Sequence, residues 1–238
     1  MIQSRQQIRK YWVYIMTKRL FINAITKYLL GIILVGLLIF LPAGTIHYPN
    51  GWLLMGILFI PMFFAGIIML LKNPDLLKKR LNAKEKQQAQ NMVVKLSGLM
   101  FLVGFIVACL NFRFDWYTLP KTIVIIAAIL FIFAYILYGV VLRQNTYLSR
   151  TIEIQANQKV IDTGLYGIVR HPMYSATLIL FLSIPLVLGS LYSFLVFLAY
   201  PFIIVKRIKN EEEFLEKELN GYREYKQKVK YRLIPFIW

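Results

Sequence analysis

Two clusters of charged residues flank the last apolar stretch of the chain, and their residue types suit the binding of a small charged molecule. The first lies in the segment Gly164–Tyr174, where Arg170 and His171 precede a proline. A helix that begins at this proline would present free backbone N–H groups to an anion. The second cluster holds Arg207 and Glu211, which share a helix face at a spacing of four residues. Guanidinium, carboxylate and helix N-terminus together can hold a zwitterionic amino-acid group. Lipid-headgroup contacts and a surface salt bridge are the alternative interpretations.

The apolar stretch between the two clusters predicts a hairpin that brings them together. Residues 174–205 are too many for one membrane-spanning helix and few for two, and Gly189-Ser190 near the middle indicates a turn. After a turn at this point, Arg207 and Glu211 return to the depth of His171 and Tyr174. Three consecutive acids, Glu211 to Glu213, point in different directions on a helix, so only one of them can face a given partner.

Four further apolar runs precede this stretch, and they define the fold class. They cover residues 28–46, 51–71, 93–112 and 122–142, each close to the 20 or so residues that cross a bilayer. With 58% hydrophobic residues, the chain is too apolar for an ordinary soluble domain. We predict an all-α, multi-pass transmembrane protein with about five to six spans, the last two forming the hairpin. Residues 1–142 would hold the first four spans behind a basic N-terminal segment, and residues 143–238 the candidate site.

The distribution of positive charge predicts the orientation in the membrane. Lys and Arg number six in residues 1–27, seven in 72–95, four in 143–170 and nine in 206–232, out of 28 in total. The predicted spans place all four segments on the same side, which the positive-inside rule identifies as the cytoplasm. Both termini and the candidate site are therefore predicted to be cytoplasmic, as are a polar helix from about Arg207 to Leu219, ended by Asn220-Gly221, and the aromatic tail after it. Topology and anionic lipids account for the net charge of +17, so nucleic acid is not a predicted partner.

Several kinds of chemistry are disfavoured by what the sequence offers. The two histidines, His47 and His171, fall on opposite sides of the predicted membrane, and Cys109 is the single cysteine, so no metal site is predicted. No nucleophile motif, phosphate loop or dinucleotide-binding glycine pattern occurs. A transporter or a non-catalytic scaffold is the alternative from another class. A transporter would place charges inside the spans, where the first four spans have almost none beyond Lys95.

The motifs around the two clusters resemble a known enzyme family. That family combines Arg-His-Pro-x-Tyr with an earlier Gly-x-Tyr and a later Glu-Glu pair beyond a helical hairpin. Here the motifs read Gly164-Leu165-Tyr166, Arg170-His171-Pro172-Met173-Tyr174 and Arg207-x-x-x-Glu211-Glu212, and the tail residues Gly221-Tyr222-x-x-Tyr225 and Arg232-Leu233-Ile234-Pro235 are also similar. Over about residues 143–238 the chain resembles the isoprenylcysteine carboxyl methyltransferase family, which is related to phospholipid N-methyltransferases.

The resemblance implies an integral membrane enzyme that uses S-adenosylmethionine and acts on a lipophilic or small-molecule acceptor. It implies that Arg207 meets the substrate in a catalytic role. The residues implied to enclose the cofactor are Gln158, Lys159, Val160, Ile161, Tyr166, His171, Pro172, Met173, Tyr174 and Glu211. A carboxylate acceptor of the isoprenylcysteine type is favoured, with a thiol or a phospholipid amine left open. An NADPH-dependent membrane reductase remains the alternative enzyme, because sterol reductases share a similar Arg-His-Pro-x-Tyr motif.

Overall fold

The helices account for almost all of the regular structure in the described residues. The computed structural model describes residues 2–82, 88–149, 151, 154–155 and 157–238, and for residues 2–17 and 89 it describes the backbone alone. The helices are α1 (Ile2–Ala43), α2 (Pro49–Lys72), α3 (Pro74–Leu81), α4 (Gln88–Arg113), α5 (Lys121–Gln144), the 3-10 turn η1 (Gly164–Gly167), α6 (Pro172–Val187), α7 (Leu191–Phe197), α8 (Ala199–Glu218) and α9 (Tyr222–Lys228). The predicted all-α class is confirmed.

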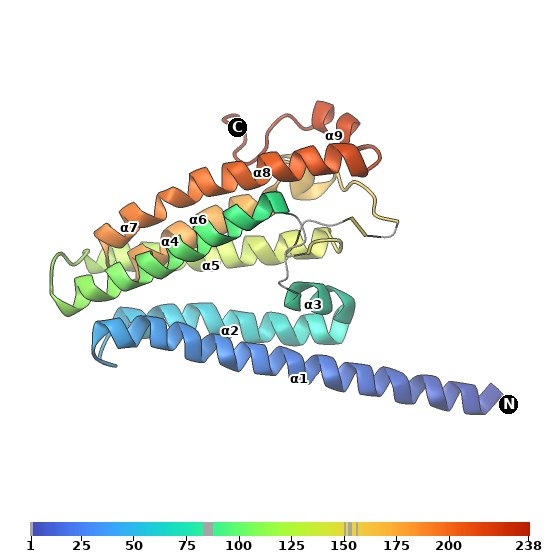
Figure 1. Ribbon diagram of the computed structural model, residues 1–238, viewed down its shortest axis with the longest axis horizontal. Coiled ribbons are helices and arrows are strands. Elements are labelled where there is room, and N and C mark those ends of the chain that lie inside the picture. Colours follow the sequence, from blue (N-terminus) through green and yellow to red (C-terminus); the bar gives the residue numbers. More distant parts are fainter. Residues whose placement is uncertain (1, 83–87, 150, 152–153, 156) are drawn as a thin grey trace.

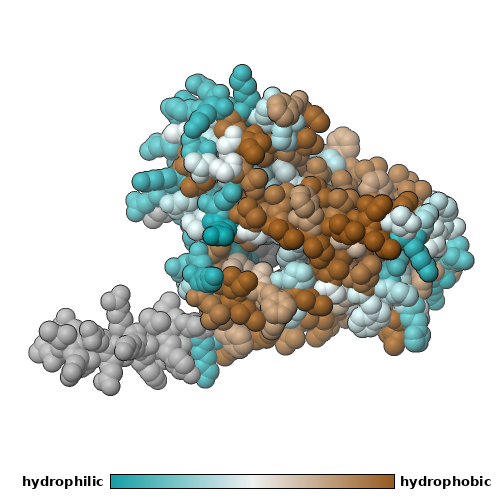
Figure 2. Space-filling model, turned by 180° about the vertical axis from the view of Figure 1, so that it is seen from behind, coloured by the Kyte–Doolittle hydropathy of each residue, from teal (hydrophilic) through white to brown (hydrophobic). Residues whose placement is uncertain are grey.

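Five helical segments among the described residues are long and apolar enough to cross a membrane. They are Lys18–Ala43, Pro49–Lys72, Gln90–Arg113, Lys121–Gln144 and Leu191–Glu218, and α6 is a shorter apolar helix. Figure 2 shows an apolar face across the middle of the molecule, with hydrophilic residues gathered at its two ends. Such a face can be stable only against lipid, because water would have to solvate a continuous apolar surface. The chain is therefore an integral, multi-pass membrane protein.

The predicted hairpin is formed by α6 and the α7–α8 pair, and it reaches the far end of the bundle. With 16 residues, α6 is about 24 Å long. At its C-terminal end, Gly189 O accepts a hydrogen bond from the Leu119 amide at 3.1 Å, and the hydroxyl of Tyr48 donates to Leu188 O. Those partners belong to the turns after α1 and α4, which lie at the left of Figure 1 together with α7. The hairpin is thus as deep as its neighbours.

The returning arm of the hairpin differs from the sequence prediction in one respect. The polar helix expected to begin at about Arg207 is no separate element, since α8 runs unbroken from Ala199 to Glu218. No glycine or proline separates the apolar from the polar residues, and Pro201 lies in the first turn, where a helix tolerates it. The predicted end is confirmed, because Gly221 adopts a left-handed conformation with φ of 84° just after α8.

One end of the bundle, here called the basic end, is built by α3, the connection from residue 145 to residue 171, and α9 (Figure 1). Lys27 Nζ donates to Leu81 O at 2.7 Å, which fixes α1 to α3. Lys79 on α3 donates to Gln155, and Arg80 donates to Ser149 O at 3.2 Å. The first half of the chain therefore supports the irregular connection that the second half uses to line a pocket.

Candidate functional site

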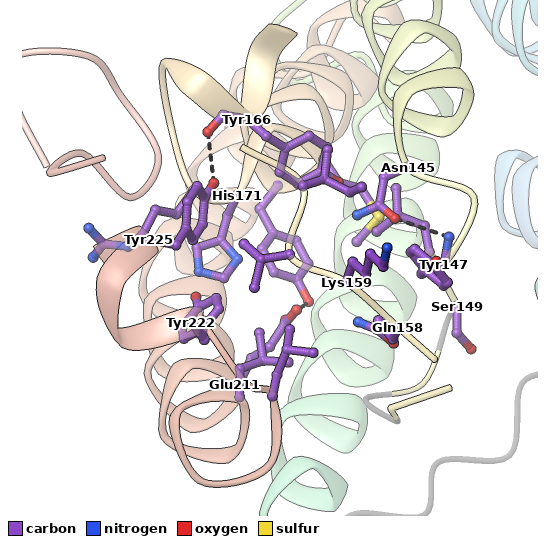
Figure 3. Close-up of a pocket in the computed structure, with 18 of the residues that line it drawn as sticks. Asn145, Tyr147, Ser149, Gln158, Lys159, Tyr166, His171, Glu211, Tyr222 and Tyr225 are labelled. Carbon is purple, nitrogen blue, oxygen red and sulfur yellow. Dashed lines mark hydrogen bonds between the residues drawn. The ribbon is translucent and has the colours of Figure 1, made fainter. Parts of the chain in front are cut away.

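A pocket opens at the basic end between the connection after α5, the start of α6 and the polar half of α8. A water-sized molecule can reach about 100 Å³ of it, and the pocket is partly open to solvent. The side chains gather from these elements around one hollow (Figure 3). Of the residues predicted from the sequence, those that line it are Gln158, Lys159, Val160, Ile161, Tyr166, His171, Met173, Tyr174, Arg207 and Glu211. Pro172 is not among the lining residues; it begins α6, as predicted.

Tyr174 connects the two charged residues that the sequence placed on one face of a helix. Its hydroxyl accepts a hydrogen bond from Arg207 Nε at 2.8 Å and donates one to Glu211 Oε2. The phenol is 5% exposed, so both contacts lie away from bulk water. Because charge-assisted hydrogen bonds are strong, this three-residue chain holds Arg207 and Glu211 in fixed positions relative to α6.

The three consecutive glutamates of α8 point to three different environments, as the helical geometry predicts. Glu211 lines the pocket. Glu212 points into the protein and is 3% exposed. Glu213 faces outward, where Lys217 Nζ lies 2.7 Å from its Oε1. Only the first of the three is therefore available to a ligand.

Glu212 is the centre of a buried charge cluster at the pocket wall, where Arg170 and His171 are lining residues. Its Oε1 accepts from Arg170 Nε at 2.7 Å and lies 3.2 Å from His171 Nε2, while its Oε2 accepts from Arg232 Nε at 2.8 Å. Arg170 Nη1 also donates to the carbonyls of Val229 and Lys230. The expectation that Arg170 strengthens an open anion site at the helix start is wrong, because its guanidinium binds these internal acceptors.

The tail after α9 closes the pocket wall through its backbone. The amides of Arg170 and His171 donate to Tyr231 O and Arg232 O, each at 2.9 Å. One turn further along α6, the Ser175 hydroxyl donates to Leu233 O. The tail therefore runs beside the first turn of α6 and satisfies amides that the helix start leaves without intrahelical partners.

The turn η1 positions Tyr166 in the pocket wall. Gly164 has a φ of 60°, and a Cβ at this position would lie 2.6 Å from Gln144 Nε2. Glycine thus allows both the left-handed turn and the hydrogen bond from the Leu165 amide to Gln144 Oε1 at 3.0 Å. On the opposite side, the Tyr225 hydroxyl donates to Tyr166 O at 2.8 Å (Figure 3).

Sequence reasoning missed part of the lining. Asn145, Tyr147, Ser149 and Thr151 belong to the irregular connection, where no motif marks them. Tyr222 and Tyr225 also line the pocket, and they belong to the Gly221-Tyr222-x-x-Tyr225 motif that the sequence analysis noted without assigning a role. In the described part of the chain, no group of three or more His, Cys, Asp or Glu residues is arranged to hold a metal ion.

Two comparisons with known proteins gave partial matches to the chain. Residues 122–221 match a family model described as phospholipid methyltransferase, which supports a membrane methyltransferase. The chain is also 32% identical, over 91 residues, to the Delta(14)-sterol reductase of Mus musculus. That match covers 37% of this chain and 22% of the reductase, so the chain spans about a fifth of that relative's length.

Proposed function

We propose that the protein is an S-adenosylmethionine-dependent methyltransferase of the membrane, and that its acceptor is a lipophilic carboxylate of the isoprenylcysteine type. The observation that carries the proposal is the contact of Arg207 and Glu211 through Tyr174, inside the segment that matches the phospholipid methyltransferase family. A purely structural membrane protein has no need for a guanidinium and a carboxylate that are held in fixed positions inside a pocket.

The residues of the pocket fit the chemical groups of the cofactor. Glu211 offers a carboxylate for the cofactor's ammonium group. Lys159 offers positive charge for its carboxylate, and the N-terminus of α6 adds the partial positive charge of a helix dipole. The aromatic rings of Tyr166, Tyr222 and Tyr225 offer apolar surface for its base. Tyr222 also has a buried hydroxyl with no hydrogen-bond partner among the described residues. Each part of the proposed cofactor therefore has a complementary group.

The proposed reaction requires little acid–base catalysis by the protein. The cofactor supplies an electrophilic methyl group on a sulfonium, which an ionised carboxylate attacks directly, since a carboxylate is deprotonated at neutral pH. The remaining requirement is alignment of the two reactants, which is worth about 7–11 kcal/mol in well-oriented systems. Arg207, held by Tyr174, is placed to orient an anionic acceptor whose apolar tail lies in the surrounding lipid.

The charge distribution supports a cytoplasmic location for this site. The basic end carries Lys27, Lys79, Arg80 and Arg170, and the turns at the other end carry Arg113 and Lys121. By the positive-inside rule, the basic end faces the cytoplasm. Acceptor and cofactor would then meet at the inner surface of the membrane, where a water-soluble cofactor is accessible.

Two other acceptors use the same geometry. A thiol reacts as its thiolate, and a phospholipid amine must lose a proton before it attacks. For an amine, the base available in the pocket wall is His171, whose Nε2 lies 3.2 Å from Glu212 Oε1. A contact of this kind fixes the ring of a histidine and favours one tautomer.

A second candidate function is an NADPH-dependent reductase, because the chain resembles a sterol reductase over 91 residues. Equilibrium binding separates the two candidates. The purified full chain in lipid nanodiscs should bind S-adenosylmethionine saturably and leave NADPH unbound. The reverse result would overturn the methyltransferase proposal.

The acceptor is identified by methyl transfer. Nanodiscs incubated with isotope-labelled S-adenosylmethionine and a total membrane extract should yield a labelled lipophilic product, identified by mass spectrometry. Glu211→Gln should weaken cofactor binding by about 10- to 100-fold, the loss of one charge-assisted contact. Glu213→Gln on the same helix is the matched control, since Glu213 faces away from the pocket, and it should bind as the wild type does.

A further inference from the structure

The hydroxyl of Tyr222 is a buried polar group without a hydrogen-bond partner in the part of the chain that the structure describes. The side chain lines the pocket and is 4% exposed. No hydrogen-bond partner for the hydroxyl exists among the described residues. Figure 3 shows the ring beside the hollow, between Tyr225 and Glu211. A buried hydroxyl without a partner destabilises the folded state, so this group is suited to a partner from outside the described residues, such as a ligand in the pocket.

The neighbouring tyrosine shows that the fold can satisfy such a group. Tyr225 lies three residues further along α9, with its ring centroid 5.7 Å from that of Tyr222. Its hydroxyl donates to Tyr166 O at 2.8 Å. The two phenols come from one short helix and contact one cluster, yet within the described residues a hydrogen-bond partner exists for the Tyr225 hydroxyl and none for that of Tyr222.

The position of the Tyr222 ring is fixed by its surroundings. It packs with Leu219, Tyr225 and Val229 in a small apolar cluster, to which Val160 and Leu215 add their side chains. Leu215 and Leu219 follow Glu211 at intervals of four residues, so the cluster continues the pocket along α8 for about 12 Å beyond that carboxylate. The pocket is thus charged at Glu211 and apolar around Tyr222.

The Tyr222 hydroxyl keeps its proton. Burial, and then the negative charges of Glu212 and Glu211, raise the pKa of this phenol far above its usual range. A neutral phenol can both donate and accept one hydrogen bond. This hydroxyl in an apolar cluster suits a ligand that presents a polar atom on a flat, largely apolar ring, such as the base of a nucleoside.

We propose that Tyr222 binds the adenosyl part of the cofactor, with its ring against the base or ribose and its hydroxyl hydrogen-bonded to a nucleoside oxygen or nitrogen. This proposal rests on the proposed function. It divides the pocket into a nucleoside subsite at Tyr222 and an amino-acid subsite at Glu211. It also adds a residue that lies beyond the segment matched by the family model, which ends at residue 221.

The test compares two ligands in two variants. Tyr222→Phe in nanodiscs should lose about 3- to 10-fold in affinity for S-adenosylmethionine, the effect of one hydrogen bond. It should lose the same factor for 5′-methylthioadenosine, which has the nucleoside and lacks the amino-acid group. Glu211→Gln should weaken only S-adenosylmethionine. Tyr117→Phe, a half-exposed tyrosine at the other end of the bundle, is the control and should leave both affinities unchanged.

A stability measurement separates a ligand contact from a structural role. Since the hydroxyl has no partner among the described residues, ligand-free Tyr222→Phe should unfold at the same temperature as the wild type or higher. Unchanged affinity for both ligands, or weaker binding together with a lower unfolding temperature, would overturn the proposal. If the wild type binds 5′-methylthioadenosine and S-adenosylmethionine but Tyr222→Phe matches it, the cofactor assignment survives and only the subsite fails. If the wild type binds neither, both proposals fail.

Discussion

Tyr174 on α6 donates its hydroxyl hydrogen to Glu211 on α8, across the interface between the two arms of the hairpin. The same oxygen accepts from Arg207. One phenol therefore sets the position of both charged groups that we assign to ligand binding. Arg207 and Glu211 both belong to α8 and meet α6 at Tyr174. The register of α8 against α6 therefore determines the geometry of the site.

Tyr174→Phe tests this relationship without changing the packing of the ring. Loss of the hydroxyl should release both Arg207 and Glu211, and we expect affinity for S-adenosylmethionine to fall about 3- to 10-fold. Tyr200→Phe is a matched control, because Tyr200 is also buried on α8 and its hydroxyl donates to Thr177 on α6 at 2.9 Å, outside the pocket. Equal losses in the two variants would show that the effect comes from the helix interface alone. Isothermal titration of the nanodisc-embedded protein measures both.

Arg207→Ala should separate acceptor binding from cofactor binding. If Arg207 orients an anionic acceptor, the variant should bind S-adenosylmethionine nearly as the wild type does and lose about 10- to 100-fold in kcat/KM for the acceptor. Its exposed neighbour Lys206, which contacts Met92, serves as the control in Lys206→Ala. A large loss of cofactor affinity with normal acceptor kinetics would move Arg207 into the cofactor subsite.

Glu212→Gln is expected to affect stability rather than ligand contact. It removes the buried charge that Arg170 and Arg232 share and leaves the Arg170 guanidinium inside the protein without a counter-charge. Breaking a buried pair in this way costs about 3–5 kcal/mol. The unfolding temperature in detergent micelles should drop sharply, and Glu213→Gln should leave it unchanged. A Glu212→Gln protein as stable as the wild type would contradict the structural role of the cluster.

Gly104→Ala tests the contact of α4 with the hairpin. A Cβ on Gly104 would lie 2.3 Å from Cε2 of Phe197, and that ring packs edge-on against Phe101 and Phe105. Overpacking of this kind costs about 1–3 kcal/mol. Gly98→Ala on the same helix is the control, since a Cβ at Gly98 would point into open space. It should be neutral or stabilising, because alanine favours a helix over glycine by roughly 0.5–1 kcal/mol. Thermal unfolding of the two variants side by side gives the comparison.

The course of the chain through the membrane could be read from the sequence because each of its signals is local. Runs of apolar residues indicated the spans, Gly189-Ser190 the turn of the hairpin, Pro172 the start of α6 and Gly221 the end of α8. The hairpin predicted that Arg207 and Glu211 return to the level of Tyr174, whereas lining residues such as Gln158 and Tyr166 were predicted from the family resemblance.

The roles within the charge clusters could not be read in the same way. Which of three consecutive glutamates faces the pocket depends on the rotation of α8 about its axis, and that rotation is set by packing against α4 and α6. Arg170 looked like part of an anion site because the sequence does not show that Val229 and Lys230 return to bind it. The described residues between 145 and 161 form no regular element with a repeating pattern, so no signal in the sequence marks Asn145 and Tyr147.

The buried cluster at Glu212 also sets the order in which the protein can mature during synthesis. Arg170 emerges from the ribosome about 60 residues before Lys230, its carbonyl partner, and all the apolar helices are complete before residues 229–233 exist. The apolar helices of the nascent chain can therefore insert before residues 229–232, whose carbonyl groups bind Arg170 and His171, have been synthesised. The backbone contacts that hold Arg170 and His171 at the pocket wall form only after the membrane helices have been made.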